Sequence, residues 1–247
     1  MQPIAVSVGS AVGAHPLWVA VAVTLLFGGL ARVVRGVSTS GAVAGGVVCF
    51  ALYAGVGSEA FAGLVLVFVL TWGATRFGYQ RKLRQGTAER KGGRTASQVL
   101  ANVGLAAVCG VAYYLSKGNP VFLVGLSAVL AEAAADTVSS ELGRALSNSA
   151  RLITTWQQVP AGTDGGVTFA GTMAGAFAGG LVALQFALTG WLSWQGAVAS
   201  WGAAVVAMFA DSFLGAALER RGLLNNDAVN FLSTSLAAAL AMGITLV

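Results

Sequence analysis

The chain has 247 residues, of which 56% are hydrophobic and only 9% are charged, with a formal net charge of +5. A soluble domain has roughly 25% charged residues, so these few charges would not cover the surface of a soluble protein of this length. The composition therefore predicts an integral membrane protein, and the lack of a basic stripe on a soluble module excludes nucleic-acid binding.

Eight apolar runs follow one another along the chain and predict membrane-spanning helices. A helix needs about 20 apolar residues to cross the hydrocarbon core. We therefore expect an all-α polytopic bundle in which residues 1–247 form a single integral membrane domain. The runs are 17–34, 41–57, 59–75, 98–115, 120–135, 167–189, 194–215 and 228–246.

The charges between the runs predict the orientation of the chain. With the N-terminus outside, thirteen of the fourteen Lys and Arg residues lie in cytoplasmic segments, and only Lys117 lies outside. The positive-inside rule therefore favours N-out and C-out, with short motif-bearing loops on the cytoplasmic face of a bacterial-type inner membrane. The cytoplasmic set is Arg32, Arg35, Arg76, Arg81, Lys82, Arg84, Arg90, Lys91, Arg94, Arg144, Arg151, Arg220 and Arg221.

Two carboxylates lie near the cytoplasmic end of the fifth run. Glu132 and Asp136 are four residues apart and share a helix face, which Ser139 and Ser140 continue. Acids at membrane depth imply a cavity or a cation, and nearby hydroxyls suit the oxygen ligands of Mg²⁺. Glu141 is a further candidate ligand. It points away from Asp136 on a regular helix, so it either serves another partner or requires the helix to break near Ser139.

A weak internal sequence repeat places a further acid at the same depth in the membrane. Ala135-Asp136-Thr137 ahead of Gly143 is repeated as Ala210-Asp211-Ser212 ahead of Gly215, and both triplets end a predicted span. Asp211 is therefore a candidate second metal ligand.

A glycine-rich segment, Gly162-Thr163-Asp164-Gly165-Gly166-Val167-Thr168, leads into the sixth run. Successive backbone N–H groups at such a turn make an anion-binding concavity, so we expect it to bind nucleotide phosphates. The same residues would also make a flexible loop with Thr168 as a helix N-cap. The sequence lacks GxxxxGK[ST], which excludes a Walker-type ATP site.

Arg94, Gln98 and Asn102 are spaced by four and predict one polar stripe entering the fourth run. A guanidinium followed by amides suits phosphate and base or ribose recognition. The alternative is a snorkelling arginine with amides that bond between helices. Lys82 is assigned to the nucleotide site as well, although most of its basic cluster is explained by attraction to lipid headgroups.

The last run opens with Asn225-Asn226-Asp227-Ala228-Val229-Asn230. Asp227 is a natural N-cap, and capping alone would explain it. Three amides beside an acid exceed what a cap needs, so Asn226, Asp227 and Asn230 are candidate nucleotide ligands. The residues themselves leave both interpretations open.

At these positions the chain resembles the DUF92 or TMEM19 family of integral membrane proteins, which includes plant and cyanobacterial phytyl-phosphate kinases. More distantly, it is similar to CTP-dependent polyprenol kinases and phosphatidate cytidylyltransferases. The motifs that carry the resemblance are Gly92-Gly93-Arg94-x-x-x-Gln98-Val99-Leu100-Ala101-Asn102, Ala135-Asp136-Thr137-x-Ser139-Ser140-Glu141-Leu142-Gly143, Gly162-Thr163-Asp164-Gly165-Gly166-Val167-Thr168-x-x-Gly171-Thr172 and Asn226-Asp227-x-Val229-Asn230.

The resemblance implies a membrane kinase that converts an isoprenyl monophosphate, such as phytyl, geranylgeranyl or farnesyl phosphate, to its diphosphate. It implies Mg²⁺ and a nucleoside triphosphate donor, with CTP favoured, and it makes Asp136, Asp164 and Arg94 the catalytic candidates. The residues themselves do not distinguish CTP from ATP or UTP.

Three other functions remain as alternatives. They are a cytidylyltransferase that forms a CDP-lipid, a polyprenol kinase and a transporter. A transporter would carry polar residues near mid-span, whereas the acids here crowd one boundary. The expected partners are nucleotide, isoprenyl lipid and membrane lipid, and the oligomeric state is open, a homo-oligomer included.

Overall fold

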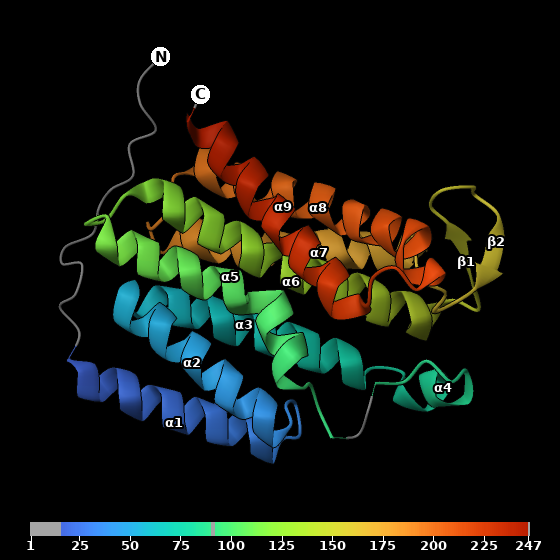
Figure 1. The fold of residues 1–247 in the computed structure, drawn as a ribbon, viewed down its shortest axis with the longest axis horizontal. Helices are drawn as coiled ribbons and strands as arrows, with labels where there is room; N and C mark the ends of the chain where they lie inside the picture. Colours follow the sequence, from blue (N-terminus) through green and yellow to red (C-terminus); the bar gives the residue numbers. More distant parts are fainter. Residues whose placement is uncertain (1–15, 90–91, 247) are drawn as a thin grey trace.

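The computed structural model describes residues 16–89 and 92–246, and within them the chain is a helical bundle whose helices run along its long axis (Figure 1). The polytopic helical fold is confirmed. Within these ranges six helices, α3 and α5 to α9, are long and apolar enough to cross a membrane, while α1 and α2 are apolar helices of 17 residues each. The bounds are α1 Leu17–Val33, α2 Thr39–Gly55, α3 Ser58–Arg76, α5 Ala96–Leu115, α6 Pro120–Leu146, α7 Phe169–Leu188, α8 Trp194–Ala217 and α9 Asn226–Leu246.

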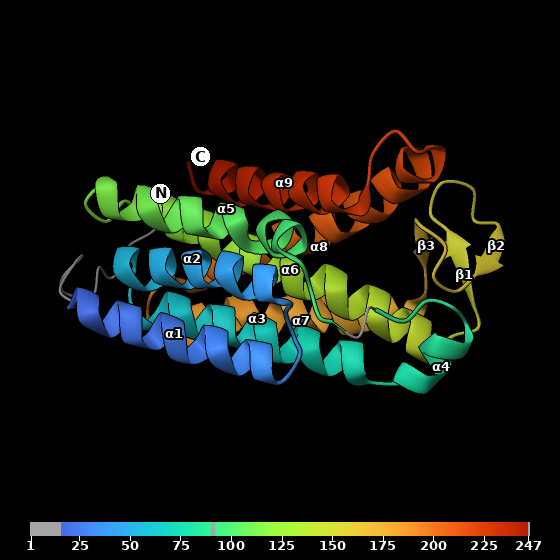
Figure 2. The ribbon, with the colours of Figure 1, turned by 60° about the horizontal axis from the view of Figure 1, so that its bottom comes forward.

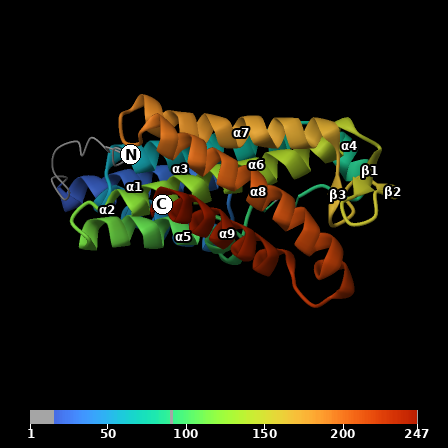
Figure 3. The same cartoon turned by 90° about the horizontal axis from the view of Figure 1, so that it is seen from above.

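Helix α6 forms the centre of the bundle and packs against α3, α5, α7, α8 and α9 (Figures 1 and 3). It has 27 residues and therefore continues well beyond the predicted run 120–135. Asp136 and Glu141 consequently lie on the helix itself, and the helix does not break near Ser139. The helix continues without a break because the sequence from Ala133 to Leu142 contains neither Gly nor Pro, the two residues that most disfavour a helix.

The contact between α6 and α7 depends on glycine. Gly171 and Gly175 of α7 face the carbonyl oxygens of Ser139 and Ala135 on α6, and a Cβ atom at either glycine would lie 2.5 Å from that oxygen. The two backbones therefore approach more closely than any larger residue allows, as in small-xxx-small packing within membranes. This approach fixes the position of the acid-bearing end of α6 against α7.

Between α6 and α7 the chain forms a small antiparallel sheet of order β2-β1-β3. In its register Ala150 pairs with Val159, and Arg151 pairs with Val167. The sequence predicts only a loop here, because strands of two to four residues are too short to show the alternation of apolar and polar residues that indicates a strand. The strands are β1 Ser149–Leu152, β2 Gln158–Pro160 and β3 Gly166–Val167.

The short elements gather at one end of the bundle (Figures 1 and 2). This end carries the sheet, α4 (Tyr79–Arg84) and the 3₁₀ turn η1 (Glu219–Arg221). Most of the loops that the charge pattern assigns to the cytoplasm lie here, whereas the connection between α1 and α2 lies nearer the middle of the bundle's length (Figures 1 and 2). Two of the basic residues in that pattern, Arg90 and Lys91, lie outside the described residues. The direction in which this end faces in the membrane remains a prediction.

We expect Gly175→Ala to destabilise the protein by about 1–3 kcal/mol, because an added methyl group forces the α6 and α7 backbones apart. The measurement is thermal unfolding of the detergent-purified protein. Gly202→Ala on α8 is the matched control, since a Cβ atom there meets nothing within 4 Å. Equal melting temperatures for the two variants would contradict the packing argument.

Candidate functional site

The ends of α5, α6, α8 and α9 and the β2–β3 loop enclose one polar cavity of about 330 Å³. These segments are far apart in the sequence, and the cavity brings together most of the residues that the motifs single out. The predicted residues that line it are Arg94, Gln98, Asn102, Asp136, Ser139, Ser140, Glu141, Gly162, Thr163, Asp164, Gly165, Gly166, Thr168, Asp211, Asn226, Asp227 and Asn230.

Carboxylates from α6 and α8 meet at the inner end of this polar cavity. Asp136 and Asp211 lie within hydrogen-bonding distance of each other. Glu132, one turn below Asp136, is only 1% exposed, and its Oε1 atom has no hydrogen-bond partner among the described residues. The hydroxyl of Ser233, which donates to the Asn230 carbonyl (3.0 Å), lies near both Glu132 and Asp211.

This arrangement suits a cation that also binds phosphate. In the part of the chain that the structure describes, no three His, Cys, Asp or Glu side chains form a complete metal cage. Mg²⁺ rarely uses such a cage, because it is usually bound by one or two carboxylates together with waters and substrate phosphates. The adjacent Asp136 and Asp211 carboxylates fit that pattern, and the unpaired Glu132 oxygen shows that protein groups alone do not satisfy the acids.

Two buried amides hold Asp211 in place. In the amide orientation that satisfies its neighbours, Asn230 donates to Oδ2 of Asp211 (3.3 Å) and accepts from Nδ2 of Asn102 (3.0 Å). Asn102 and Asn230 are both at least nine-tenths buried. The chain of hydrogen bonds therefore links α5, α9 and α8 behind the carboxylates.

Arg94 is positioned by its backbone. Its N–H donates to the Gly36 carbonyl (3.1 Å), and its carbonyl accepts from the Ser38 N–H (2.9 Å). Gly93 makes this approach feasible, because its φ of 79° favours glycine and a Cβ atom would lie 2.7 Å from the Val37 backbone. The guanidinium then reaches α6, where it donates to Thr137 Oγ1 (3.2 Å) beside the acids.

Helix capping uses two residues differently from the sequence expectation. Thr95 is the N-cap of α5, so Arg94 precedes the helix and does not share a helical stripe with Gln98. Gln98 completes a capping box by accepting from the Thr95 N–H (2.8 Å). At α9 the cap is Asn225, whose Oδ1 accepts from the Ala228 N–H (2.9 Å), and the expectation that Asp227 is the cap is wrong.

Lys82 lies away from the polar cavity, which corrects its assignment to the nucleotide. Its side chain is 0% exposed, and Nζ donates to the carbonyls of Ala74 (3.0 Å) and Thr75 (2.8 Å) and to the Glu141 carboxylate. All three ammonium protons are therefore used within the protein. Glu141 accepts from Arg144 as well (3.2 Å), so on this unbroken helix it serves cations of the protein.

Arg144 belongs to the candidate site, although in the sequence it stands out only as one of the basic residues that predict the orientation. It lines the polar cavity, donates to the Thr87 carbonyl (3.2 Å) and lies near enough to interact with the Asp136 charge. The sequence signal that could have identified Arg144 is its position one helical turn after Glu141. Glu89 and Glu219 also line the cavity, and no pattern in the sequence indicates either of them.

The β2–β3 loop presents free backbone donors. The Thr163 N–H donates to Pro160 (3.3 Å) and the Gly166 N–H to Thr163 (2.8 Å). The N–H groups of Gly162, Asp164 and Gly165 make no hydrogen bond to any described residue. Free N–H groups at a glycine turn suit an anion, and phosphate binding by this segment stays a prediction.

The two glycines of the internal sequence repeat, Gly143 and Gly215, pack against the segment from Gly162 to Thr168. Gly215 lies under Gly165, where an added Cβ atom would lie 3.0 Å from the Gly165 nitrogen. Gly143 lies against Thr168, which caps α7 by accepting from the Gly171 N–H (3.0 Å), as expected. Asp136 and Asp211 are therefore each followed by a glycine that lets the loop region pack beside them.

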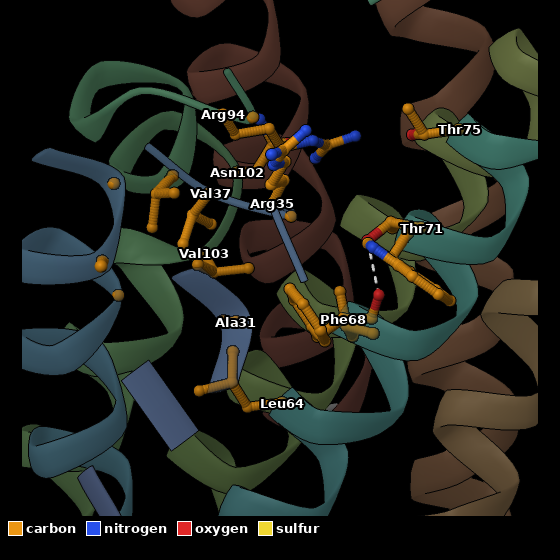
Figure 4. A pocket seen from close by; sticks show the side chains of 18 of the residues that line it. Ala31, Arg35, Val37, Leu64, Phe68, Thr71, Thr75, Arg94, Asn102 and Val103 are labelled. Carbon is orange, nitrogen blue, oxygen red and sulfur yellow. Dashed lines mark hydrogen bonds between the residues drawn. The ribbon is translucent and has the colours of Figure 1, made fainter. Parts of the chain in front are cut away.

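A second cavity, the apolar pocket, adjoins the polar one. It measures about 280 Å³ and lies between α1, α2, α3 and α5. Figure 4 shows Arg35, Arg94 and Asn102 near one end of it and Leu64 at the other. Glu89, Arg94 and Asn102 line both cavities and form their common wall.

The motif-bearing region recurs in known proteins. The family model described as integral membrane protein DUF92 matches residues 22–238. Protein VTE6, chloroplastic, of Arabidopsis thaliana is 32% identical over 240 residues, which cover 93% of this chain and 72% of that protein. An uncharacterised membrane protein of a Synechocystis strain is 33% identical over 197 residues, or 78% of this chain and 76% of that protein. No solved structure matches the chain significantly.

We expect Lys82→Met to destabilise the fold by about 3–5 kcal/mol, because it removes the buried cation that faces Glu141. The double variant Lys82→Met with Glu141→Gln should recover a large part of this loss, since no buried carboxylate is left without Lys82 and the partly exposed Arg144 keeps its bond to the Thr87 carbonyl. Thermal unfolding in detergent measures both effects, and Arg84→Met, at an exposed position of α4, is the control. If the double variant is less stable than the single one, the ion-pair account is wrong.

Proposed function

Because the chain belongs to the DUF92 family of integral membrane proteins, we propose that it is a membrane kinase that transfers a phosphoryl group from a nucleoside triphosphate to an isoprenyl monophosphate. The observation that carries this proposal is the common wall of the polar cavity and the apolar pocket at Arg94 and Asn102. A lipid phosphate needs both environments, one for its hydrocarbon tail and one for its charged head. The motif resemblance to phytyl-phosphate kinases supports the same reaction.

Arg94 is proposed to bind the acceptor phosphate. Its guanidinium lies at the common wall and is oriented by Thr137 (3.2 Å). A guanidinium binds phosphate oxygens through two parallel hydrogen bonds and stays charged at the membrane surface. The acceptor oxygen is already anionic, so the reaction requires charge neutralisation and alignment and needs no general base.

The donor triphosphate is proposed to lie in the polar cavity. Arg144 and the free N–H groups of the β2–β3 loop would bind its phosphate oxygens, while Asp136 and Asp211 would hold Mg²⁺, with Glu132 behind them. When bound, Mg²⁺ neutralises charge on the transferring phosphates. CTP is the proposed donor on the strength of the resemblance, and the amides of Asn226 and Asn230 are the candidates for contact with its base or ribose.

We place this chemistry on the cytoplasmic face of a bacterial-type inner membrane. The charge pattern supports that orientation, and nucleoside triphosphates are cytoplasmic metabolites. The polar cavity lies at the end of the bundle that carries the basic loops, so the donor would enter from the cytoplasm.

We expect Asp136→Asn and Asp211→Asn to lower kinase activity on the order of a hundredfold or more, because each removes a carboxylate that would hold the Mg²⁺ needed to neutralise phosphate charge. The assay incubates purified protein with γ-labelled CTP, ATP, UTP or GTP and with phytyl, geranylgeranyl or farnesyl monophosphate, and identifies the labelled lipid.

Glu59→Gln, at the start of α3, is the control and should retain activity. Full activity of Asp136→Asn would refute the site assignment. Release of pyrophosphate, with the nucleotide left on the lipid, would show a cytidylyltransferase in place of a kinase.

The orientation predicts thiol accessibility. Leu223→Cys lies between α8 and α9 and Lys117→Cys between α5 and α6, and both positions are exposed, whereas the native Cys49 and Cys109 are buried. A membrane-impermeant maleimide should label Lys117→Cys in intact cells and Leu223→Cys only in inside-out vesicles. The reverse pattern would overturn N-out, C-out.

A further inference from the structure

The apolar pocket has the depth of about one leaflet. Along α3 its wall runs from Leu64 to Arg76, twelve residues that rise roughly 18 Å at about 1.5 Å per residue. The hydrocarbon core of a bilayer is ~30 Å thick, so the pocket extends from the polar end of the bundle to just beyond mid-membrane. A lipid tail whose head lies at Arg94 would therefore fit along its length.

The deep end of the pocket lies at Phe27 of α1 and the buried Leu64 of α3, the lining residues of these helices that are farthest along the chain from Arg35 and Arg76. Behind Phe27 lies Phe61, whose ring meets it edge to face (5.5 Å), and Tyr53 contacts Phe61 (6.0 Å). Phe61 and Tyr53 do not line the pocket, so they back its floor. Phe68 forms the side wall above the floor, where its ring contacts Phe27 (5.4 Å) and lies against Gly36.

The wall formed by α2 consists of small residues, Gly41, Ala42 and Gly45. Gly41 is required by packing, because a Cβ atom there would collide with the Arg94 carbonyl oxygen. Gly45 is not required in this way, since the nearest atom to an added Cβ is Cγ1 of Val99 at 3.9 Å. The space beside Gly45 is therefore open to a ligand, and a larger side chain can be placed there without a backbone clash.

The head end of the pocket carries positive charge. Arg35 and Arg94 both line it near the polar end, and Figure 4 shows them above Phe68 and Leu64. A cavity that is cationic at one end and closed by rings at the other matches an anionic head on a branched hydrocarbon of limited length.

We propose that the apolar pocket holds the isoprenyl tail of the acceptor, with its phosphate at Arg94 and its far end against Phe27 and Leu64, so that these two side chains set the longest chain accepted. The identity of the tail rests on the proposed kinase function. The position and the closed end of the pocket rest on the geometry alone.

The test compares kcat/KM for geranyl, farnesyl and geranylgeranyl monophosphate. Phe27→Ala opens the floor and should raise the ratio of geranylgeranyl to geranyl activity by about tenfold or more. Gly45→Leu narrows the wall and should lower that ratio by a similar factor. Phe177→Ala on α7, where the ring is 68% exposed on the surface of the bundle, is the matched control and should leave the ratio unchanged.

A second measurement separates this proposal from the kinase proposal. A geranylgeranyl monophosphate with a diazirine at its tail end is photolysed with the purified protein, and the labelled peptides are mapped by mass spectrometry. Labelling at Phe27, Leu64 or Phe68 supports the pocket even if no nucleotide is turned over, in which case only the kinase function fails. Kinase activity with the same chain-length ratio in wild type, Phe27→Ala and Gly45→Leu overturns the pocket, as does labelling confined to other helices.

Discussion

The structure depends on one constraint, which is that α6 is surrounded by other helices and cannot turn its polar side chains toward water or lipid. A buried charge without a partner costs several kcal/mol, so each acid on this helix needs a cation or a cavity. Glu141 meets Lys82 and Arg144, whereas Asp136 opens into the polar cavity. The end of the fold that carries the short elements is organised around these needs. The position of helix α4 places Lys82 beside Glu141, and the segment before α5 places Arg94 at the polar cavity.

The second requirement is close approach of backbones, because the groups of the site come from segments that are distant in the sequence. Gly93 brings Arg94 against the α1–α2 connection, and Gly215 lets the β2–β3 loop lie on the end of α8. Gly171 fixes α7 against the acid-bearing turn of α6. Each contact joins a site-bearing segment to a helix or to the connection between two helices, so the groups proposed to bind phosphate are placed by the bundle itself and not by free loops. Preorganisation of this kind is what phosphoryl transfer mainly requires.

The sequence predicted the helices and the depth of the acids, because long apolar runs and i, i+4 spacing are local signals. It could not predict that Lys82 pairs with Glu141, since the two residues are 59 positions apart and each alone resembles an ordinary interfacial charge. The sheet was missed because its strands are too short for alternation. The apolar pocket was missed for a different reason. It exists where α1, α2 and α3 separate, and side-chain patterns within single helices carry no information about that separation.

Lys82 and Arg94 show why lysine and arginine occupy different positions at this end of the bundle. The Lys82 ammonium is a compact charge with three donors, and two carbonyls and one carboxylate satisfy it completely inside the protein. The Arg94 guanidinium has five donors in a plane, and its side-chain bond to Thr137 uses only one nitrogen. Donor capacity therefore remains at Arg94, at the boundary where the polar cavity meets the apolar pocket. A lysine at that boundary would keep the charge but lose the planar array of donors. An arginine at this position therefore suits a phosphate head above a hydrocarbon tail. Two glycines on separate segments, Gly93 and Gly41, leave the room that its backbone needs.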